Sequence, residues 1–247
     1  SIELDAPSLD GLRRLSFVQA IFEGDVDELR LLDSSPGFAL PDTLVTGAKY
    51  RGKTNELVTQ LGINIALATQ ETKRAPTLLD PMAGRGTTLL WAMRYGMASR
   101  GIERDKKAIE DLQRHLKRQT KLHRIKHKLS TGFVGKKNKQ DLGKFLQFDA
   151  ADTSLRLIIG DSKDARQHLQ KQRFSMLVTD LPYGVQHTDK SGTRNPLTNI
   201  ENCAPGWVES LEPGGAMVLI FNAFQPKRDA LAALFREHGL EEQDFTA

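Results

Sequence analysis

The chain has 247 residues, 39% of them apolar and 27% charged, which suits one α/β domain with at most a small additional element. Every apolar run is far shorter than the roughly 18 residues of a membrane span, and the single cysteine, Cys203, excludes an internal disulfide and any site of two thiolates. We therefore expect a cytoplasmic protein. Because the sequence opens with Ser1 and without a signal peptide, we also expect it to be part of something longer.

The net charge of +4 is distributed unevenly along the chain. Between residues 113 and 147, eleven Lys and Arg residues stand against one acid, so this stretch carries +10 and the rest of the chain −6. Such a run favours an anionic partner, above all a nucleic acid, over a merely solvated insertion. We predict that RNA is contacted through Lys136, Lys137, Lys139 and neighbouring basic residues.

Two elements are expected before the main body of the chain. Residues 14–33 alternate apolar and polar side chains on both sides of Gly24-Asp25, which predicts a small β-hairpin. Apolar residues at helical spacing predict a helix over residues 55–68. We divide the chain into a small N-terminal β element and linker, 1–48, and a main domain, 49–247, with a basic insertion at about 113–147.

From residue 77 onward, short apolar strands alternate with helices. This alternation predicts an α/β fold with a doubly wound, mostly parallel sheet. The expected strands are 77–80, 99–105, 155–162, 174–184 and 216–222, the expected helices are 89–98, 106–122, 165–172 and 227–239, and a turn is expected at 212–215.

A glycine turn follows the first of these strands, where open α/β sheets bind their ligands. The sequence Asp80-Pro-Met-Ala-Gly-Arg-Gly-Thr-Thr88 lacks the third glycine of a dinucleotide fingerprint, although Glu103 lies where an acid would hold ribose hydroxyls. Asp80 would repel a pyrophosphate and suits a cationic ligand. S-adenosylmethionine, with its ammonium, sulfonium and ribose, fits better than a nicotinamide dinucleotide.

The polar ends of this cofactor match residues at successive strand ends. We assign the amino-acid moiety to Asp80 and the turn, the ribose to Glu103, and the adenine edge to Asp161 with Ser162. Asp80 and Asp161 would instead serve as simple caps if no ligand bound there. The turn residues in this assignment are Met82, Gly84, Gly86 and Thr87.

The fourth strand ends in an acid, a proline and an aromatic residue, Asp180-Leu181-Pro182-Tyr183. Proline stiffens the turn, so that the Asp180 carboxylate and a main-chain carbonyl can grip one exocyclic amine. Two acceptors on its hydrogens would aim the lone pair of the nitrogen at the methyl sulfonium. Tyr183 would stack on a base removed from its own stack. We predict that these four residues form the catalytic turn.

These motifs resemble those of the class I methyltransferases that modify exocyclic amines, over about residue 49 to the C-terminus. DLPYG, together with KYRGKTNE at 49–56, resembles the tRNA guanine-N2 methyltransferases that carry an N-terminal THUMP domain. The resemblance implies a Rossmann-like fold and N2-methylguanosine in tRNA as the product. Arg85 departs from the small residue usual in the family, residues 1–48 are too few for a THUMP domain, and the final antiparallel strand pair is incomplete.

Other classes stay open at this point. An adenine-N6 DNA or rRNA methyltransferase uses a similar turn, and a non-catalytic RNA-binding module would bind without transferring a methyl group. A glutamine methyltransferase is disfavoured because that family has Asn where this chain has Asp180. The histidines lack carboxylates at ligand spacing, so we expect no metal.

Overall fold

The computed structural model describes residues 6–24, 28–32, 37–48, 50, 53–135, 143–181, 196–222 and 224–244. A seven-stranded sheet has the order β5-β6-β7-β4-β3-β8-β9. Its strands are β3 (Thr77–Asp80), β4 (Ala98–Glu103), β5 (His127–Phe133), β6 (Lys144–Ala150), β7 (Thr153–Ile159), β8 (Phe174–Asp180) and β9 (Leu211–Ile220). Strands β7, β4, β3, β8 and β9 are mutually parallel, whereas β5 and β6 are antiparallel additions at one edge.

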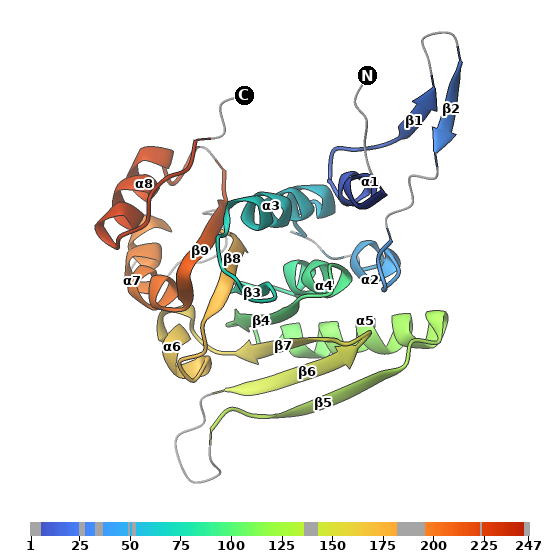
Figure 1. Ribbon diagram of the computed structural model, residues 1–247. Helices are drawn as coiled ribbons and strands as arrows, with labels where there is room; N and C mark the ends of the chain where they lie inside the picture. The colour runs from blue at the N-terminus through green and yellow to red at the C-terminus, as the bar shows by residue number, and fades with distance from the viewer. Residues whose placement is uncertain are drawn as a thin grey trace.

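Helices cover both faces of this sheet (Figure 1). One face carries α2 (Thr43–Thr46), α3 (Glu56–Thr69), α4 (Thr87–Arg94) and α5 (Lys107–His123), and the other carries α6 (Ala165–His168), α7 (Pro196–Glu209) and α8 (Arg228–Glu237). Neighbouring residues of a strand enter opposite cores, as with Leu78 and Leu79 of β3. Such near-continuous apolar strands are typical of parallel sheets buried on both sides. The predicted doubly wound, mostly parallel fold is confirmed.

The small N-terminal β element is also confirmed, with a helix before it. Strands β1 (Ile21–Gly24) and β2 (Leu29–Leu32) pair antiparallel, and α1 (Ala6–Arg13) precedes them. This hairpin projects from the body (Figure 1). It is shorter than the 14–33 expected, and α1, α2 and α7 were not predicted. The division at residue 48 stays a prediction.

The described residues of the basic stretch 113–147 contain regular structure, and its interpretation as an insertion stays a prediction. Its first part completes α5, and β5 and β6 form a hairpin that extends the sheet beyond β7. Neither strand was predicted. In addition, the expected turn at 212–215 lies within β9 as an irregularity, because Leu211 pairs with Phe174 and the next paired residue is Ala216, opposite Met176.

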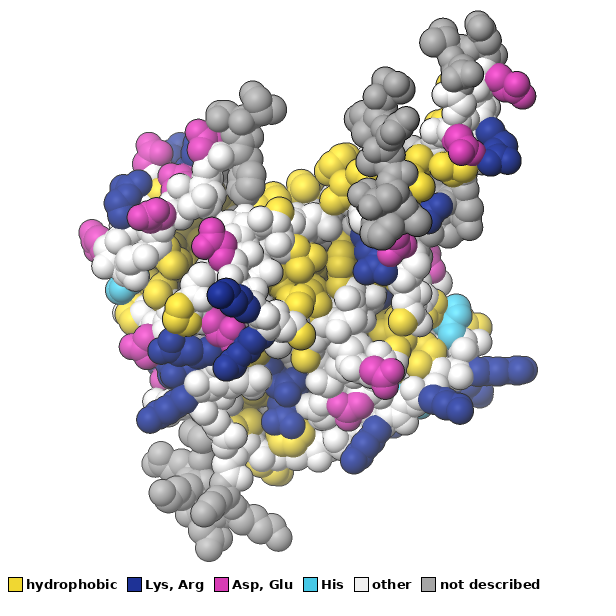
Figure 2. All heavy atoms as spheres, viewed as in Figure 1, with side chains coloured by type: hydrophobic (Ala, Val, Ile, Leu, Met, Phe, Trp, Pro, Cys, Tyr) yellow, Lys and Arg dark blue, Asp and Glu magenta, His cyan; other side chains and the backbone are white. Residues whose placement is uncertain are grey.

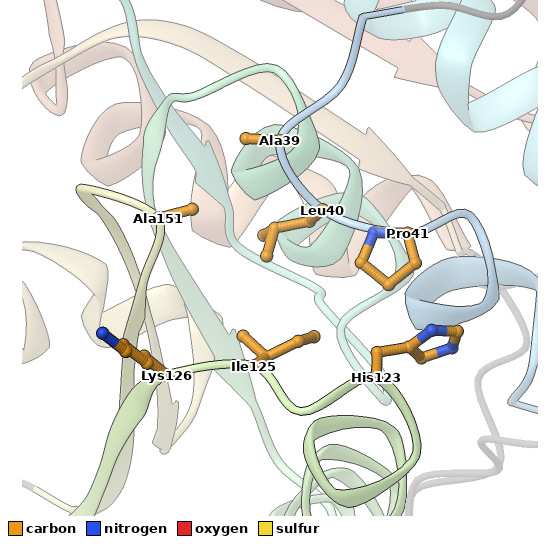
Figure 3. Close-up of a pocket in the computed structure, with 7 residues that line it drawn as sticks. All are labelled: Ala39, Leu40, Pro41, His123, Ile125, Lys126 and Ala151. Atoms are coloured by element: carbon orange, nitrogen blue, oxygen red, sulfur yellow. The ribbon is translucent and has the colours of Figure 1, made fainter.

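Two surface hollows lie at the amino ends of the parallel strands. Figure 3 shows one, of about 480 Å³, between the loop that leads into α2, the end of α5 and the β6–β7 turn, with His123 and Lys126 among its lining residues. The second, of about 730 Å³, shares Lys126 and reaches Thr77 and Ala98 at the starts of β3 and β4. Both are therefore at the edge of the sheet opposite to the predicted site.

Candidate active site

The predicted site residues that the structure describes lie at or just after the carboxyl ends of β3, β4, β7 and β8. Strand order reverses between β3 and β8, because the chain proceeds from β3 to β4 and β7 on one side and later to β8 and β9 on the other. Open α/β sheets bind ligands at such a switch point. Asp80 ends β3 and Asp180 ends β8, so the two carboxylates belong to the two strands that flank this point.

The Asp80 side chain is only 2% exposed and is held by three donors. Its Oδ1 accepts hydrogen bonds from the Thr179 hydroxyl at 2.7 Å and from the Met82 amide at 3.0 Å, and the Thr88 hydroxyl also donates to it. Burial raises the pKa of Asp80 to about 6, and the charge of Asp180 acts in the same direction, while the three hydrogen bonds lower it. A cationic ligand would relieve both unfavourable effects.

The glycine turn connects Asp80 to α4. Gly84 and Gly86 have φ of +52° and +85°, values that favour glycine, and the Gly86 amide donates to the Ala83 carbonyl at 2.7 Å. Among the described residues, nothing lies within 4 Å of a Cβ built on Gly84. The turn thus exposes backbone to open space directly before a helix begins, as required for a ligand held against the main chain.

Glu103, at the end of β4, is bonded to this turn. Its Oε2 accepts from the Gly84 amide at 2.8 Å and its Oε1 accepts from the Asp105 amide at 2.7 Å. Each carboxylate oxygen has a second lone pair, so Glu103 can retain both amides and still accept from two hydroxyls. The predicted ribose acceptor is therefore placed beside the turn and oriented by it.

Asp161 and Ser162 follow β7 and both have structural partners. Asp161 caps the short 3-10 helix η1 (Ser162–Asp164) by accepting from the Lys163 amide at 3.1 Å. The buried Ser162 hydroxyl accepts from the Trp207 indole nitrogen at 2.9 Å. Their assignment to adenine stays a prediction, since the capping alternative accounts for the contacts of Asp161.

The catalytic turn is described at its first two residues, whereas Pro182 and Tyr183 lie outside the described residues. Asp180 accepts a hydrogen bond from the Thr54 hydroxyl. Leu181 is 2% exposed, packs in the core beneath α7, and donates its amide to the Ile220 carbonyl at 2.8 Å. Its side chain therefore anchors the turn to the sheet.

Several site residues were not assigned from the sequence, although two of them lie in the KYRGKTNE motif. Tyr50 shares a hydrogen bond of 2.8 Å with Thr87, and Thr54 bonds Asp180. The guanidinium of Arg85 lies 5.0 Å from the centre of the Tyr50 ring and pairs with Asp111 at 2.7 Å. Arg85, which departs from the family pattern, is thus occupied by partners on α5 and beside the turn.

Within the described part of the chain, no cluster of three or more His, Cys, Asp or Glu is arranged to hold a metal ion. No helix in the same part is long and apolar enough to cross a membrane.

The doubly wound sheet with its glycine turn at the switch point has the Rossmann-like methyltransferase fold. Residues 59–242, well over half of the chain, match the RMKL-like methyltransferase domain family, and the chain belongs to that family. Among curated protein sequences, none matches significantly.

Three solved structures illustrate the similarity of the fold. TrmN from Thermus thermophilus is 16% identical, with 79% of this chain and 44% of that chain covered and a TM-score of 0.48. An S-adenosylmethionine-dependent methyltransferase from Agrobacterium tumefaciens is 18% identical, with coverages of 90% and 65% and a TM-score of 0.49. The 16S rRNA N2 G1207 methyltransferase RsmC from T. thermophilus, solved with AdoMet and guanosine, is 18% identical, with coverages of 89% and 45% and a TM-score of 0.45. This chain therefore spans between 44% and 65% of the length of these proteins.

Proposed function

We propose that this domain transfers a methyl group from S-adenosylmethionine to an exocyclic purine amine in RNA, with N2 of guanosine in tRNA as the target. One observation carries the proposal: Asp80, beside the glycine turn, and Asp180 lie at the carboxyl ends of two neighbouring strands, β3 and β8. The motif resemblance of DLPYG narrows the acceptor to an amine, and family membership supports methyl transfer.

The residues around the turn fit the cofactor. Open space beside Gly84 admits the ligand to the backbone, Glu103 has lone pairs for two ribose hydroxyls, and the buried charge of Asp80 would be stabilised by the ammonium group. When bound, S-adenosylmethionine supplies an electrophilic methyl group on a sulfonium. No phosphate has to approach Asp80, which is why this cofactor suits the site better than a dinucleotide.

Asp180 would act on the acceptor amine by position and charge. An exocyclic amine of a purine is a weak nucleophile because its lone pair is delocalised into the ring. By accepting hydrogen bonds from this nitrogen, Asp180 orients the lone pair and stabilises the positive charge that develops on it. The nitrogen becomes strongly acidic after attack, so a strong general base is not needed. Tyr183 would stack on the flipped base.

RNA contact is proposed along the side of the molecule formed by α5 and the β5–β6 hairpin. We define the α5–β5 basic face as the exposed residues Lys117, Arg118, Lys121, Arg124, Lys126 and Lys128. No ion pair is formed by any of them with described residues, which leaves their charges available for phosphates. Lys and Arg side chains gather at the lower right of Figure 2, where α5 ends and β5 begins.

The strand directions bring two ends of the β5–β6 hairpin to the edge of the sheet that carries the candidate site. Because β6 is antiparallel to β7, the ends of the hairpin strands at Phe133 and Lys144 lie at the carboxyl edge of the sheet. Lys136, Lys137 and Lys139 belong to the connection between these ends and lie outside the described residues. The start of β5 and the end of α5 lie at the other edge, about 25 Å away for a helix of this length.

The test is incubation with labelled S-adenosylmethionine and total tRNA, rRNA or DNA, followed by digestion to nucleosides. We expect label in N2-methylguanosine from tRNA, and a fall of about 10²–10³ in kcat for Asp180→Asn, by analogy with the loss of one preorganised polar group. Label in N6-methyladenine would show that the acceptor is adenine N6 and not guanine N2. Cofactor binding without transfer to any nucleic acid would favour a binding module.

A further inference from the structure

A hydrogen bond between distant parts of the sequence orients the carboxylate of the catalytic turn. The Thr54 hydroxyl donates to Oδ2 of Asp180, 126 residues further along the chain. Thr54 immediately precedes the N-cap of α3, whereas Asp180 ends β8 on the sheet beneath that helix. The contact therefore fixes a reacting side chain from outside its own turn.

Both neighbours of Thr54 are themselves held in place. The Lys53 ammonium, whose side chain is 10% exposed, donates to the carbonyls of Val45 at 2.7 Å and Ala48 at 2.8 Å and pairs with Glu56. Asn55 caps α3, its side chain accepting from the Leu57 amide at 2.8 Å. A hydroxyl between two such anchors has little freedom to leave Asp180, so it is preorganised.

The same stretch of sequence also contacts the glycine turn. Tyr50, four residues before Thr54, shares its hydroxyl with Thr87 at the start of α4, and its ring lies under Arg85. One short stretch thus contacts the turn beside Asp80 and the carboxylate of Asp180. This arrangement sets the geometry between the cofactor side and the acceptor side of the site.

We propose that Thr54 is a positioning residue that holds the Asp180 carboxylate toward the acceptor amine, a role that rests on the proposed function. It touches neither substrate nor cofactor, and it acts by fixing one carboxylate oxygen so that the other faces the reacting nitrogen. A displacement of about 1 Å at a reacting group can cost roughly 100-fold in rate. The effect of losing the hydroxyl should therefore fall on kcat.

The test compares Thr54→Val, which removes the hydroxyl but keeps the branched shape, with Thr54→Ser, which restores it. Thr69→Val is the matched control, because Thr69 lies at the other end of α3 and its hydroxyl donates to the Ile65 carbonyl at 2.8 Å. We expect Thr54→Val to lower kcat about 10- to 100-fold, with the Kd for S-adenosylmethionine within about twofold of wild type, and Thr54→Ser and Thr69→Val to stay near wild type. A Thr54→Val enzyme with unchanged kcat would overturn the positioning role. So would a lower kcat that is fully explained by a smaller folded fraction or by weaker S-adenosylmethionine binding.

A second measurement separates this role from the proposed function. The carboxyl carbon of Asp180 can be titrated by NMR without any substrate, and the charge of Asp80, which acts on it, is the same in every variant. Loss of a hydrogen bond to the ionised form should raise the pKa of Asp180 in Thr54→Val but not in Thr69→Val. An unchanged titration would refute the positioning contact, whereas a wild-type protein that transfers no methyl group would refute only the proposed function.

Discussion

Asp80→Asn should stabilise the fold at neutral pH, because the wild-type carboxyl is ionised there in buried surroundings. Burial raises the pKa of Asp80 from its ordinary value of 3.8 to about 6. Between these two values the folded protein binds more protons than the unfolded chain, so the free energy of unfolding falls as pH rises through this window and is constant above it. The difference between the two pKa values corresponds to about 3 kcal/mol in the free energy of unfolding.

Part of the stabilisation expected for Asp80→Asn is offset, because the variant also loses hydrogen bonds to an ionised carboxylate. Asparagine keeps one acceptor oxygen for the Thr179 hydroxyl and the Met82 amide, but these bonds no longer have an ionised acceptor and are weaker. We therefore expect a net stabilisation of about 1–3 kcal/mol at pH 7.5. At pH 4 the wild-type carboxyl is mostly protonated, so the advantage of the variant should vanish.

Urea unfolding at several pH values between 4 and 7.5 measures this difference directly. Trp91 and Trp207 are 4% and 0% exposed and lie in the two cores, so their fluorescence reports global unfolding. Asp244→Asn, at an exposed position, is the control and should change stability by no more than about 0.5 kcal/mol at any pH. A difference between wild type and Asp80→Asn that does not depend on pH would refute the argument from burial.

Three further predictions concern cofactor binding, packing against the glycine turn and RNA binding. Glu103→Ala should weaken S-adenosylmethionine binding by about 1–3 kcal/mol in calorimetry, and NADH should not bind. Gly101→Ala should destabilise the fold by about 1–3 kcal/mol in urea unfolding, because its Cβ would lie 2.7 Å from both Ala83 and Leu89. Gly11→Ala should not, because no described residue lies within 4 Å of a Cβ built there. Replacing Lys136, Lys137 and Lys139 by glutamate should raise the KM for RNA far more than it lowers kcat. Added salt should have the same effect, and a KM that does not change with salt would contradict this account.

The sequence was informative about the central strands because burial on both faces leaves a strong apolar signal. Strand β8 is buried from Phe174 to Thr179, and β3 is buried from Leu78 to Asp80. The positions of the strand ends, where the predicted site residues lie, could be located for the same reason, since parallel strands bring their carboxyl ends to one edge. What the pattern could not provide was the burial of Asp80, on which its pKa depends.

Strands β5 and β6, with one lysine each, were missed because they are only partly buried and lie within a longer basic stretch. In β6 only every second residue, Leu146, Phe148 and Ala150, is buried, and β5 is mostly exposed at the edge of the sheet. Such half-exposed strands lack the near-continuous apolar run of the buried central strands, so a weak strand signal is expected there. The charge was interpreted as evidence of an insertion, and among the described residues it is spread over α5, the turn after it and the starts of β5 and β6.

The contacts that complete the site join residues whose spacing in sequence carries no information. Thr54 contacts Asp180, and Tyr50 contacts Thr87, only because α3 packs over β8 and beside α4.

The site places two carboxylates, Asp80 and Asp180, on neighbouring strands, and this arrangement has an electrostatic consequence. Burial raises the pKa of Asp80, and the charge of Asp180 acts in the same direction, so without a ligand the two charges oppose each other. A cation bound between them would offset this repulsion, and the hydroxyls of Thr54, Thr88 and Thr179 hold the carboxylates in position until it arrives. The same charges that reduce the stability of the empty fold therefore favour a sulfonium cofactor.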